Sequence, residues 1–480
     1  MRDLRNLRIK KRITGFIAAF LIICLPFTAL ADTVWPLFET ELHAASACVM
    51  DADTGEILYE KDMHSKRYPA SITKLLTALI VCERCELSEE VTFSLSACAN
   101  LESGAVTVGT WEGDVLTVEE CLDALLLKSA NEVANALAEH VAGSVEDFCV
   151  LMNERAAQLG CVDSDFHNPN GLTNEAHVTS AYDMALIARA CLENETLMGI
   201  EAKRTSHIST TSTYPGGLTV TIGHKMLLEG DPYYDSRAIA GKTGFTSASG
   251  NTLVTMAEDN GRRLCAVVLK DSNPEHYVDT KALLDYGFDM FSCYERELTE
   301  EELINGLKEL SAQPEEGSLV SLEERLIITV PEGTDESLIE EEFYEDEAAG
   351  GYFVRLSLPD AGVSGSGVKI SIIEPETPAE TGPESTEEFF SYDAADEEDA
   401  SGTGFHIDEE LDEDLILLAA GVLSLVSGVI LVVFIRKKKR EEEHRRLKLV
   451  RERRARRLME GNISEEEFRE RLLSERNEKK

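Results

Sequence analysis

One stretch decides the fold: Arg67-Tyr68-Pro69-Ala70-Ser71-Ile72-Thr73-Lys74-Leu75-Leu76-Thr77. Pro69-Ala70-Ser71 opens a helix that continues with apolar residues at positions 75, 76, 79, 80 and 81, the spacing of a buried helix. Ser71 and Lys74 lie three residues apart, which places both side chains on one face of that helix. Because a serine hydroxyl needs a neighbouring base to act as a nucleophile at neutral pH, the pair predicts covalent catalysis.

Two further motifs follow along the chain, Ser129-Ala130-Asn131 and Lys242-Thr243-Gly244. Each short motif is weak evidence alone, since a Ser-x-x-Lys arises by chance about once or twice in a chain of this length. The three motifs occur in a fixed order, each in a fitting local context, and together they indicate a single acyl-transfer site.

The proposed roles follow from what acyl transfer requires. Ser71 attacks a carbonyl carbon and becomes an ester, while Lys74 takes the serine proton and must therefore be a neutral amine. Ser129 can relay a proton to the leaving amine, and Asn131 can orient both the substrate amide and Lys74. A buried site with a second cation nearby lowers a lysine pKa, and Lys242 could be that cation.

The third motif is expected to bind substrate. Lys242 and Thr243 can hold a carboxylate by charge and by hydroxyl. Gly241 and Gly244 let a substrate backbone approach the edge of a strand closely. Backbone N–H groups at the helix start around Ser71 suit an oxyanion site.

The residues around these motifs predict an α+β layered domain over residues 42–296, with central helices flanked by antiparallel strands. The expected strands are a hairpin at 44–60 and two runs, Asn251–Ala257 and Leu264–Lys270, joined by a turn at 258–261. The expected helices cover residues 117–141, 145–159, 182–192 and 279–291.

The later segments differ in composition. Residues 297–376 are predicted to form a small β-rich domain, with strands at 326–330, 352–356 and 368–372. Residues 377–414 are rich in Pro, Glu, Thr, Ser and Asp and predict a disordered, acidic stalk.

Both ends of the chain carry targeting signals. A basic start, an apolar run at 13–30 and Ala29-Leu30-Ala31 predict a signal peptide over residues 1–31, with an uncleaved anchor as the alternative. Residues 415–435 carry no charge and are long enough to form one transmembrane helix. Basic residues follow, so the positive-inside rule predicts a single-pass cell-membrane protein whose tail, 436–480, is cytoplasmic and whose catalytic domain is extracytoplasmic.

The 480 residues carry a formal net charge of −43 although both ends are basic. So acidic an ectodomain argues against binding nucleic acid through its bulk surface. The chain has eleven cysteines, most of them in apolar stretches where cysteine behaves as a small buried hydrophobe. Cys82-Glu83-Arg84-Cys85 has no partner motif at zinc-site spacing and is interpreted as structural, with a local disulfide or a metal as alternatives.

Further segments around the motifs resemble the D-alanyl-D-alanine carboxypeptidases, the low-molecular-mass penicillin-binding proteins of active-serine type. They lie at residues 67–77, 128–134, 167–172, 177–185 and 241–251. The resemblance implies a β-lactamase/penicillin-binding-protein-like transpeptidase domain, with an antiparallel sheet and a helical cluster.

By the same resemblance the substrate is a peptidoglycan stem pentapeptide ending in D-Ala-D-Ala, from which the last D-Ala is removed. It also implies that β-lactams acylate Ser71 as covalent inhibitors. The oxyanion hole would consist of the backbone N–H groups of Ser71 and Phe245. No metal or organic cofactor is implied.

Two features depart from the pattern of many relatives. Those relatives end in an amphipathic helix rather than a membrane span, and they carry an arginine before the last helix that helps hold the substrate carboxylate. Residues 273–277, Asn-Pro-Glu-His-Tyr, contain no arginine, which leaves open whether His276 replaces it.

Three alternatives remain at this point. A β-lactamase is one, although no Glu-x-x-Leu-Asn element occurs between Asn131 and Lys242. A non-catalytic or weakly catalytic sensor of wall fragments or β-lactams, signalling through the tail, is another. Endopeptidase or transpeptidase activity on crosslinked stems would use the same acyl-enzyme.

Overall fold

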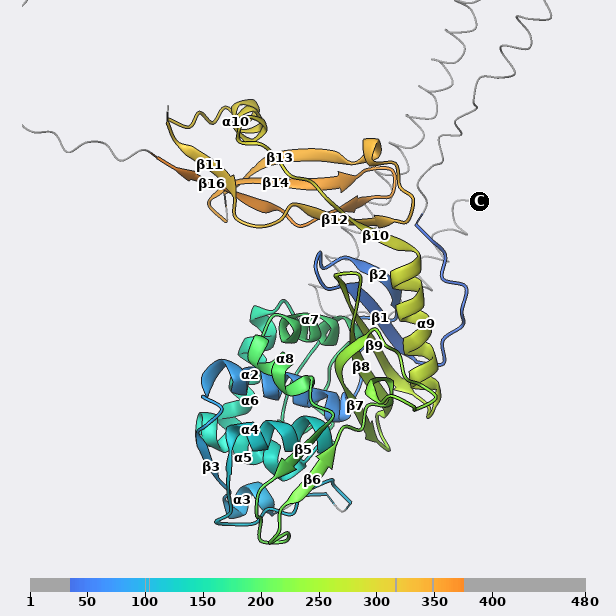
Figure 1. Ribbon diagram of the computed structural model, residues 1–480, viewed down its shortest axis with the longest axis vertical. Coiled ribbons are helices and arrows are strands. Elements are labelled where there is room, and N and C mark those ends of the chain that lie inside the picture. The colour runs from blue at the N-terminus through green and yellow to red at the C-terminus, as the bar shows by residue number, and fades with distance from the viewer. Residues whose placement is uncertain (1–34, 100, 103, 316, 348, 375–480) are drawn as a thin grey trace, which may run out of the picture. The chain divides into compact units, whose positions relative to one another are not determined.

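The computed structural model describes residues 35–99, 101–102, 104–315, 317–347 and 349–374 (Figure 1). The predicted signal peptide, acidic stalk, transmembrane segment and basic tail lie outside these residues. Within the described ranges, no helix combines the length and apolarity needed to cross a bilayer.

A five-stranded antiparallel sheet carries the Lys-Thr-Gly motif on a strand at its end, in the order β2-β1-β9-β8-β7. Its strands are β1 (Ser46–Asp51), β2 (Ile57–Lys61), β7 (Ala238–Thr246), β8 (Gly250–Asp259) and β9 (Arg262–Asp271). The predicted hairpin at 44–60 and the predicted strand pair after the motif are both confirmed. Asn260 and Gly261 in the turn between β8 and β9 both have positive φ, as a tight hairpin turn requires.

Helices pack on both faces of this sheet. The helical segments are η1 (Ala70–Thr73), α2 (Lys74–Arg84), α3 (Leu95–Cys98), α4 (Val118–Asp123), η2 (Ala124–Lys128), α5 (Asn131–Ala142), α6 (Val145–Gln158), α7 (Ala181–Leu192), α8 (Glu195–Glu201), η3 (Lys225–Leu227) and α9 (Glu275–Asp289). Both α7 and α9 contact β1, β8 and β9, and Figure 1 shows these two helices on opposite sides of the sheet. One continuous apolar core, from Leu42 to Phe291, fills the space between the layers.

Two small hairpins complete this part of the chain. They pair β3 (Glu90–Thr92) with β4 (Val115–Thr117), and β5 (Thr205–Ile208) with β6 (Leu218–Thr221). Local caps set several helix starts: the Ser180 side chain accepts from the backbone N–H of Asp183 at the start of α7. Thr117 and Glu120 form a reciprocal capping box at α4.

The prediction of one continuous helix over residues 117–141 is wrong. Residues 124–128 form a π-helical turn, and Ser129 then adopts the left-handed conformation with φ of 67° before α5 begins at Asn131. The apolar periodicity continues across this break, so it could not reveal the interruption. The helix predicted at 279–291 begins earlier, at Glu275, and ends at Asp289.

A second apolar core, from Leu303 to Ile370, lies in the later residues. Two sheets build this part: β10 (Phe291–Glu295) pairs with β12 (Ile327–Pro331), and a second sheet has the order β11-β16-β14-β13 with β15 beside β14. Its elements are β11 (Leu319–Leu322), β13 (Glu340–Asp346), β14 (Gly351–Leu358), β15 (Val363–Ser364), β16 (Val368–Ile373), α10 (Glu300–Glu309) and η4 (Glu336–Leu338). The three strands predicted here are confirmed, whereas α10 and the acidic strand β13 were not predicted.

Candidate active site

Lys74 is the central residue of the site, and its side chain is completely buried. Its amine nitrogen lies 3.0 Å from the Ser71 hydroxyl oxygen and 2.9 Å from the Asn131 amide oxygen, and it also donates to the backbone carbonyl of Asn170. The three-residue spacing predicted this Ser71–Lys74 pairing, because η1 and the first turn of α2 place both side chains on one face.

These contacts fit a neutral amine. The carbonyl oxygens of Asn131 and Asn170 can only accept hydrogen bonds, so they take both N–H donors of a neutral lysine. The remaining lone pair then faces the Ser71 hydroxyl, which can donate its proton. Burial holds the pKa of Lys74 well below its usual range, and the positive charge of Lys242 lowers it further. Lys74 is therefore arranged to act as a base toward Ser71.

The second motif is held in place by backbone contacts. The side-chain amide of Asn131 donates to the carbonyl of Val106 at 2.9 Å, and this leaves its oxygen facing Lys74. Ser129 occupies the left-handed turn just before α5 and is half-buried. Its hydroxyl has no hydrogen-bond partner among the described residues, so it is available to a bound substrate.

A buried relay of hydrogen bonds fixes the turn before Ser71. The backbone N–H of His167 donates to Nδ1 of His177, so the proton of this neutral ring sits on Nε2 and is donated to the Thr73 hydroxyl. Burial lowers the pKa of His177 to about 3, which keeps the ring neutral. Thr73 in turn donates to the carbonyl of Ala70, whose φ of 53° lies in the left-handed region. The relay stabilises a backbone conformation that an L-residue rarely adopts.

Gly171 packs directly against this strained turn. Its φ is 83°, and a Cβ at this position would overlap the backbone carbonyl of Ala70. We expect Gly171→Ala to destabilise the fold by about 2–4 kcal/mol, because steric overlap adds to the cost of positive φ. For a domain of this size the melting temperature, Tm, should then fall by about 4–16 °C.

Gly143→Ala is the matched control, because Gly143 has φ of 84° and open space around the position of a Cβ. Tm values measured by scanning calorimetry for the two variants therefore separate backbone strain from steric overlap. If the Gly171→Ala and Gly143→Ala proteins had the same Tm, this result would contradict the close packing of Gly171 against Ala70.

The third motif brings β7 against the nucleophile. A Cβ at Gly244 would come within 2.9 Å of the backbone nitrogen of Ser71, and it would also overlap the Thr252 hydroxyl. Only a glycine allows this approach. Phe245, the next residue, has a side chain that is 64% exposed. The backbone of Ser71 and the strand segment that includes Phe245 therefore lie side by side, as a two-donor oxyanion site requires.

Lys242 is 3% exposed and donates to the carbonyl of Thr243 at 2.8 Å. Burial lowers its pKa to about 8, and the negative charge of Glu201 counteracts this effect. Glu201 is buried at the end of α8; one of its carboxylate oxygens accepts from the N–H of Gly241, and the other has no partner within the described residues. Burial raises the pKa of Glu201 to about 7. The protonation states of Lys242 and Glu201 together therefore set the net charge of this part of the site.

This arrangement predicts an alkaline limit to substrate binding. Lys242 is charged below its pKa, so KM for a substrate with a terminal carboxylate should rise as pH increases through about 8. Glu201→Gln removes the anion that raises the pKa of Lys242, so it should move this limit to lower pH. Lys242→Arg keeps its charge and should move the limit to higher pH. Steady-state kinetics against pH measure both shifts, and a limit that neither variant moves would exclude Lys242 as its source.

His276 does not supply the missing arginine charge. It is 5% exposed, its Nδ1 lies 3.0 Å from the carbonyl of Ser272, and burial lowers its pKa. A neutral, buried ring cannot replace a guanidinium as a carboxylate-binding cation. Of the lysines in the three motifs, Lys242 is therefore the one that we expect to bind the substrate carboxylate.

Comparison with known proteins defines the class. Residues 33–273, half of the chain, match peptidase family S11, D-alanyl-D-alanine carboxypeptidase. The chain therefore belongs to the D-alanyl-D-alanine carboxypeptidase family.

Individual relatives agree with this assignment. The chain is 31% identical over 262 residues to D-alanyl-D-alanine carboxypeptidase DacF of Bacillus subtilis, an alignment that covers 53% of this chain and 65% of that protein. It is 30% identical over 246 residues to D-alanyl-D-alanine carboxypeptidase DacB2 of Mycobacterium tuberculosis, covering 50% of this chain and 80% of the relative. The chain thus spans slightly less than two thirds of the length of the B. subtilis relative.

A solved structure extends the likeness beyond the family match. Penicillin binding protein 6B from Escherichia coli superposes with a TM-score of 0.54 and 26% identity, over 71% of this chain and 97% of that protein. The penicillin-binding-protein fold predicted from the sequence is confirmed.

Sequence reasoning missed two contributors to this site, the carbonyl of Asn170 and the side chain of Glu201. The carbonyl of Asn170 has no side-chain signature, although the Asn-Pro-Asn-Gly loop that carries it had been noted as part of the resemblance. Glu201 is far from every motif in sequence. His177 lies in the segment 177–185 that carries the resemblance, and it supports the site structurally through the relay to Ala70.

Proposed function

We propose that the chain is a serine-type D-Ala-D-Ala carboxypeptidase that removes the terminal D-Ala from peptidoglycan stem pentapeptides. The observation that carries this proposal is the buried Lys74 amine, which lies 3.0 Å from the Ser71 hydroxyl oxygen and contacts two carbonyl acceptors. Family membership supports the same reaction class.

In the acylation step, Ser71 Oγ attacks the carbonyl carbon of the penultimate D-Ala while its proton moves to Lys74 Nζ. The N–H groups of Ser71 and Phe245 hold the oxygen of the tetrahedral intermediate. The peptide C–N bond then breaks as Ser129 gives its hydroxyl proton to the departing D-Ala amine and takes in its place the proton that Lys74 holds, which leaves Lys74 neutral again. Asn131 orients the substrate amide during these movements.

Binding and deacylation use the remaining groups. Lys242 and Thr243 hold the terminal carboxylate, and Gly244 lets the substrate backbone lie close to β7. Once D-Ala has left, a water molecule attacks the ester carbonyl and Lys74 accepts its proton; the ester C–O bond then breaks and Lys74 returns this proton to Ser71 Oγ, which regenerates the enzyme. No metal or organic cofactor takes part in this scheme.

Penicillins should undergo the same acylation step, but the resulting ester should be hydrolysed slowly. Attack of Ser71 on the strained lactam carbonyl opens the ring, but the amine stays tethered to the acyl group. The leaving group therefore remains in the site and hinders the deacylating water. We propose that β-lactams inhibit the protein as slowly hydrolysed adducts on Ser71.

We also propose that the catalytic domain works outside the cell. The charge and hydropathy patterns support a signal peptide at 1–31, an acidic stalk at 377–414, one membrane helix at 415–435 and a cytoplasmic tail at 436–480. Such an anchor would hold the site near its wall substrate.

The full chain, purified in detergent, tests the function directly. We expect it to release D-Ala from a tripeptide ending L-Lys-D-Ala-D-Ala, and pre-incubation with benzylpenicillin should abolish this release. Fluorescent penicillin should label the protein with a lifetime far longer than one catalytic cycle. Rapid penicillin turnover without D-Ala release would overturn the proposal, as would labelling with no release from this substrate.

A further inference from the structure

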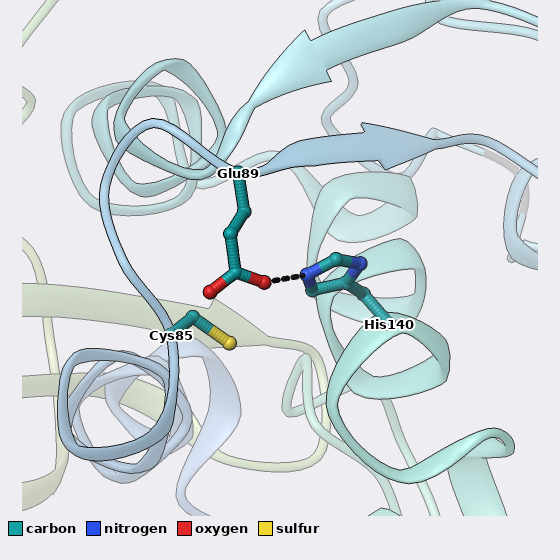
Figure 2. A group of neighbouring side chains, drawn as sticks. All are labelled: Cys85, Glu89 and His140. Carbon is teal, nitrogen blue, oxygen red and sulfur yellow. Dashed lines mark hydrogen bonds and ion pairs between the residues drawn. The ribbon is translucent and has the colours of Figure 1, made fainter.

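The side chains of Cys85, Glu89 and His140 lie close together, as Figure 2 shows. The ligand atoms of Cys85, Glu89 and His140 all lie within 4.8 Å of one another. Cys85 caps the C-terminus of α2, Glu89 directly precedes β3, and His140 lies in the last turn of α5. One Glu89 carboxylate oxygen is 3.0 Å from Nε2 of His140.

The donor set suits a particular class of metal. Thiolate, imidazole and carboxylate are the three ligand types that Zn²⁺ takes in proteins, usually with tetrahedral geometry. The second oxygen of Glu89 accepts from the backbone N–H of Glu86 at 2.7 Å, which fixes the orientation of the carboxylate. The His140 and Glu89 side chains are 23% and 42% exposed, so a metal ion can enter and a water molecule can complete the coordination.

The local charges also favour a cation. Burial raises the pKa of the Cys85 thiol and the neighbouring Glu89 carboxylate raises it further, while the positive charge of Arg84 has the smaller, opposite effect. A divalent ion between the two groups would reverse this repulsion and deprotonate the thiol. Cys82, the other cysteine of the Cys-x-x-Cys pattern, is not a member of the cluster. The cluster thus shares Cys85 with the Cys-x-x-Cys pattern and takes its other two residues from outside that pattern.

We propose that Cys85, Glu89 and His140 bind one Zn²⁺ that clamps α2 to α5. Lys74 begins α2 and Asn131 begins α5, whereas Cys85 and His140 stand at the opposite ends of the same two helices. The 11 residues of α2 span roughly 16 Å, so an ion at the far end of this helix would take no part in the chemistry at Ser71 and Lys74. Its role is structural: it ties together the far ends of the helices that present the base and its amide partner.

Metal analysis of the full chain tests this proposal without reference to activity. After exposure to Zn²⁺ and removal of excess ion, mass spectrometry should find one zinc per chain. Cys85→Ser and His140→Gln should each lose it. Cys293→Ser and His207→Gln are the matched controls, because both residues are exposed and neither belongs to the cluster; each should retain the ion. Co²⁺ in place of zinc should give a thiolate-to-cobalt absorption band in the parent that Cys85→Ser abolishes.

Thermal melting provides a second readout that separates metal binding from folding. At about 100 times its Kd, Zn²⁺ should raise the Tm of the parent and both controls by about 5–10 °C, and this increment should vanish in Cys85→Ser and His140→Gln. The increment is the difference between the Tm values of the same protein with and without zinc, so a variant with a lower Tm in the absence of zinc can still be compared with the parent. Absence of zinc from the parent, retention of zinc by either cluster variant, or loss of zinc in Cys82→Ser alone would overturn the proposal.

Discussion

Ser71→Ala is expected to slow D-Ala release by the full chain by at least about 10⁴-fold and to abolish covalent labelling by penicillin. The reason is chemical, because alanine offers no atom that can form the ester. The fold should be unaffected, since the Ser71 hydroxyl has Lys74 as its hydrogen-bond partner and Lys74 keeps two carbonyl acceptors without it. Release of D-Ala and fluorescent penicillin labelling measure the two effects.

Ser236→Ala is the control for this experiment, because Ser236 is exposed and belongs to none of the three motifs. It should match the parent in both assays. Normal D-Ala release by a Ser71→Ala protein would reject the acyl-enzyme, and labelling at another serine would reject this site.

Replacement of Lys74 has the second largest expected effect. Without its base the acylation rate should fall by roughly 10²–10⁴-fold, the range typical for general-base catalysis. Lys74→Met tests removal of the amine, and Lys74→Arg tests whether charge alone suffices, because an arginine cannot give up its proton at accessible pH. The rate of penicillin acylation, followed by stopped-flow fluorescence, reports this step without interference from deacylation.

Lys74→Met also leaves the acceptors of Asn131 and Asn170 unpaired in a buried site, so the variant should lose about 1–3 kcal/mol of stability. Melting curves therefore accompany the kinetics, and rates are compared well below the lowest Tm. A folded Lys74→Arg protein that acylates at the parent rate would show that Lys74 acts by its charge and is not the base.

Much of the fold follows from local patterns in the sequence. The hairpin at 44–60 and the strands β8 and β9 were predicted because short apolar runs end at strong turn residues. The start of α2 was predicted from Pro69 and the apolar spacing after it. In each case the local preference and the tertiary environment favour the same structure.

The incorrect predictions concern segments in which tertiary contacts override the local preference of the sequence. The break at Ser129 is imposed by tertiary contacts, because the N–H and side chain of Asn131 both bond to the carbonyl of Val106 in a distant loop. Strand β13 contains three consecutive glutamates, a composition that disfavours strands, yet its pairing with β14 places Glu342 opposite Arg355, with which it forms an ion pair. Propensity cannot anticipate a partner that only the fold supplies.

The motif residues of the site were predictable, but their supports were not. Ser71, Lys74 and Asn131 meet as expected because each belongs to a recognisable pattern. Glu201 and the carbonyl of Asn170 belong to no motif and reach the site only through packing. The same holds for Cys85 and His140, which 55 positions of sequence separate and which no ligand spacing connects.

The end position of β7 in its sheet has a consequence for selectivity. Within the described residues this strand pairs with β8 on one side, so the backbone groups on its other side can hydrogen-bond to an incoming extended peptide. Binding by strand addition depends on main-chain hydrogen bonds and depends little on the side chains of the bound peptide. A protein of this design would accept stem peptides that differ in the residue before the two D-alanines, and would distinguish its substrates by backbone handedness and by the terminal carboxylate.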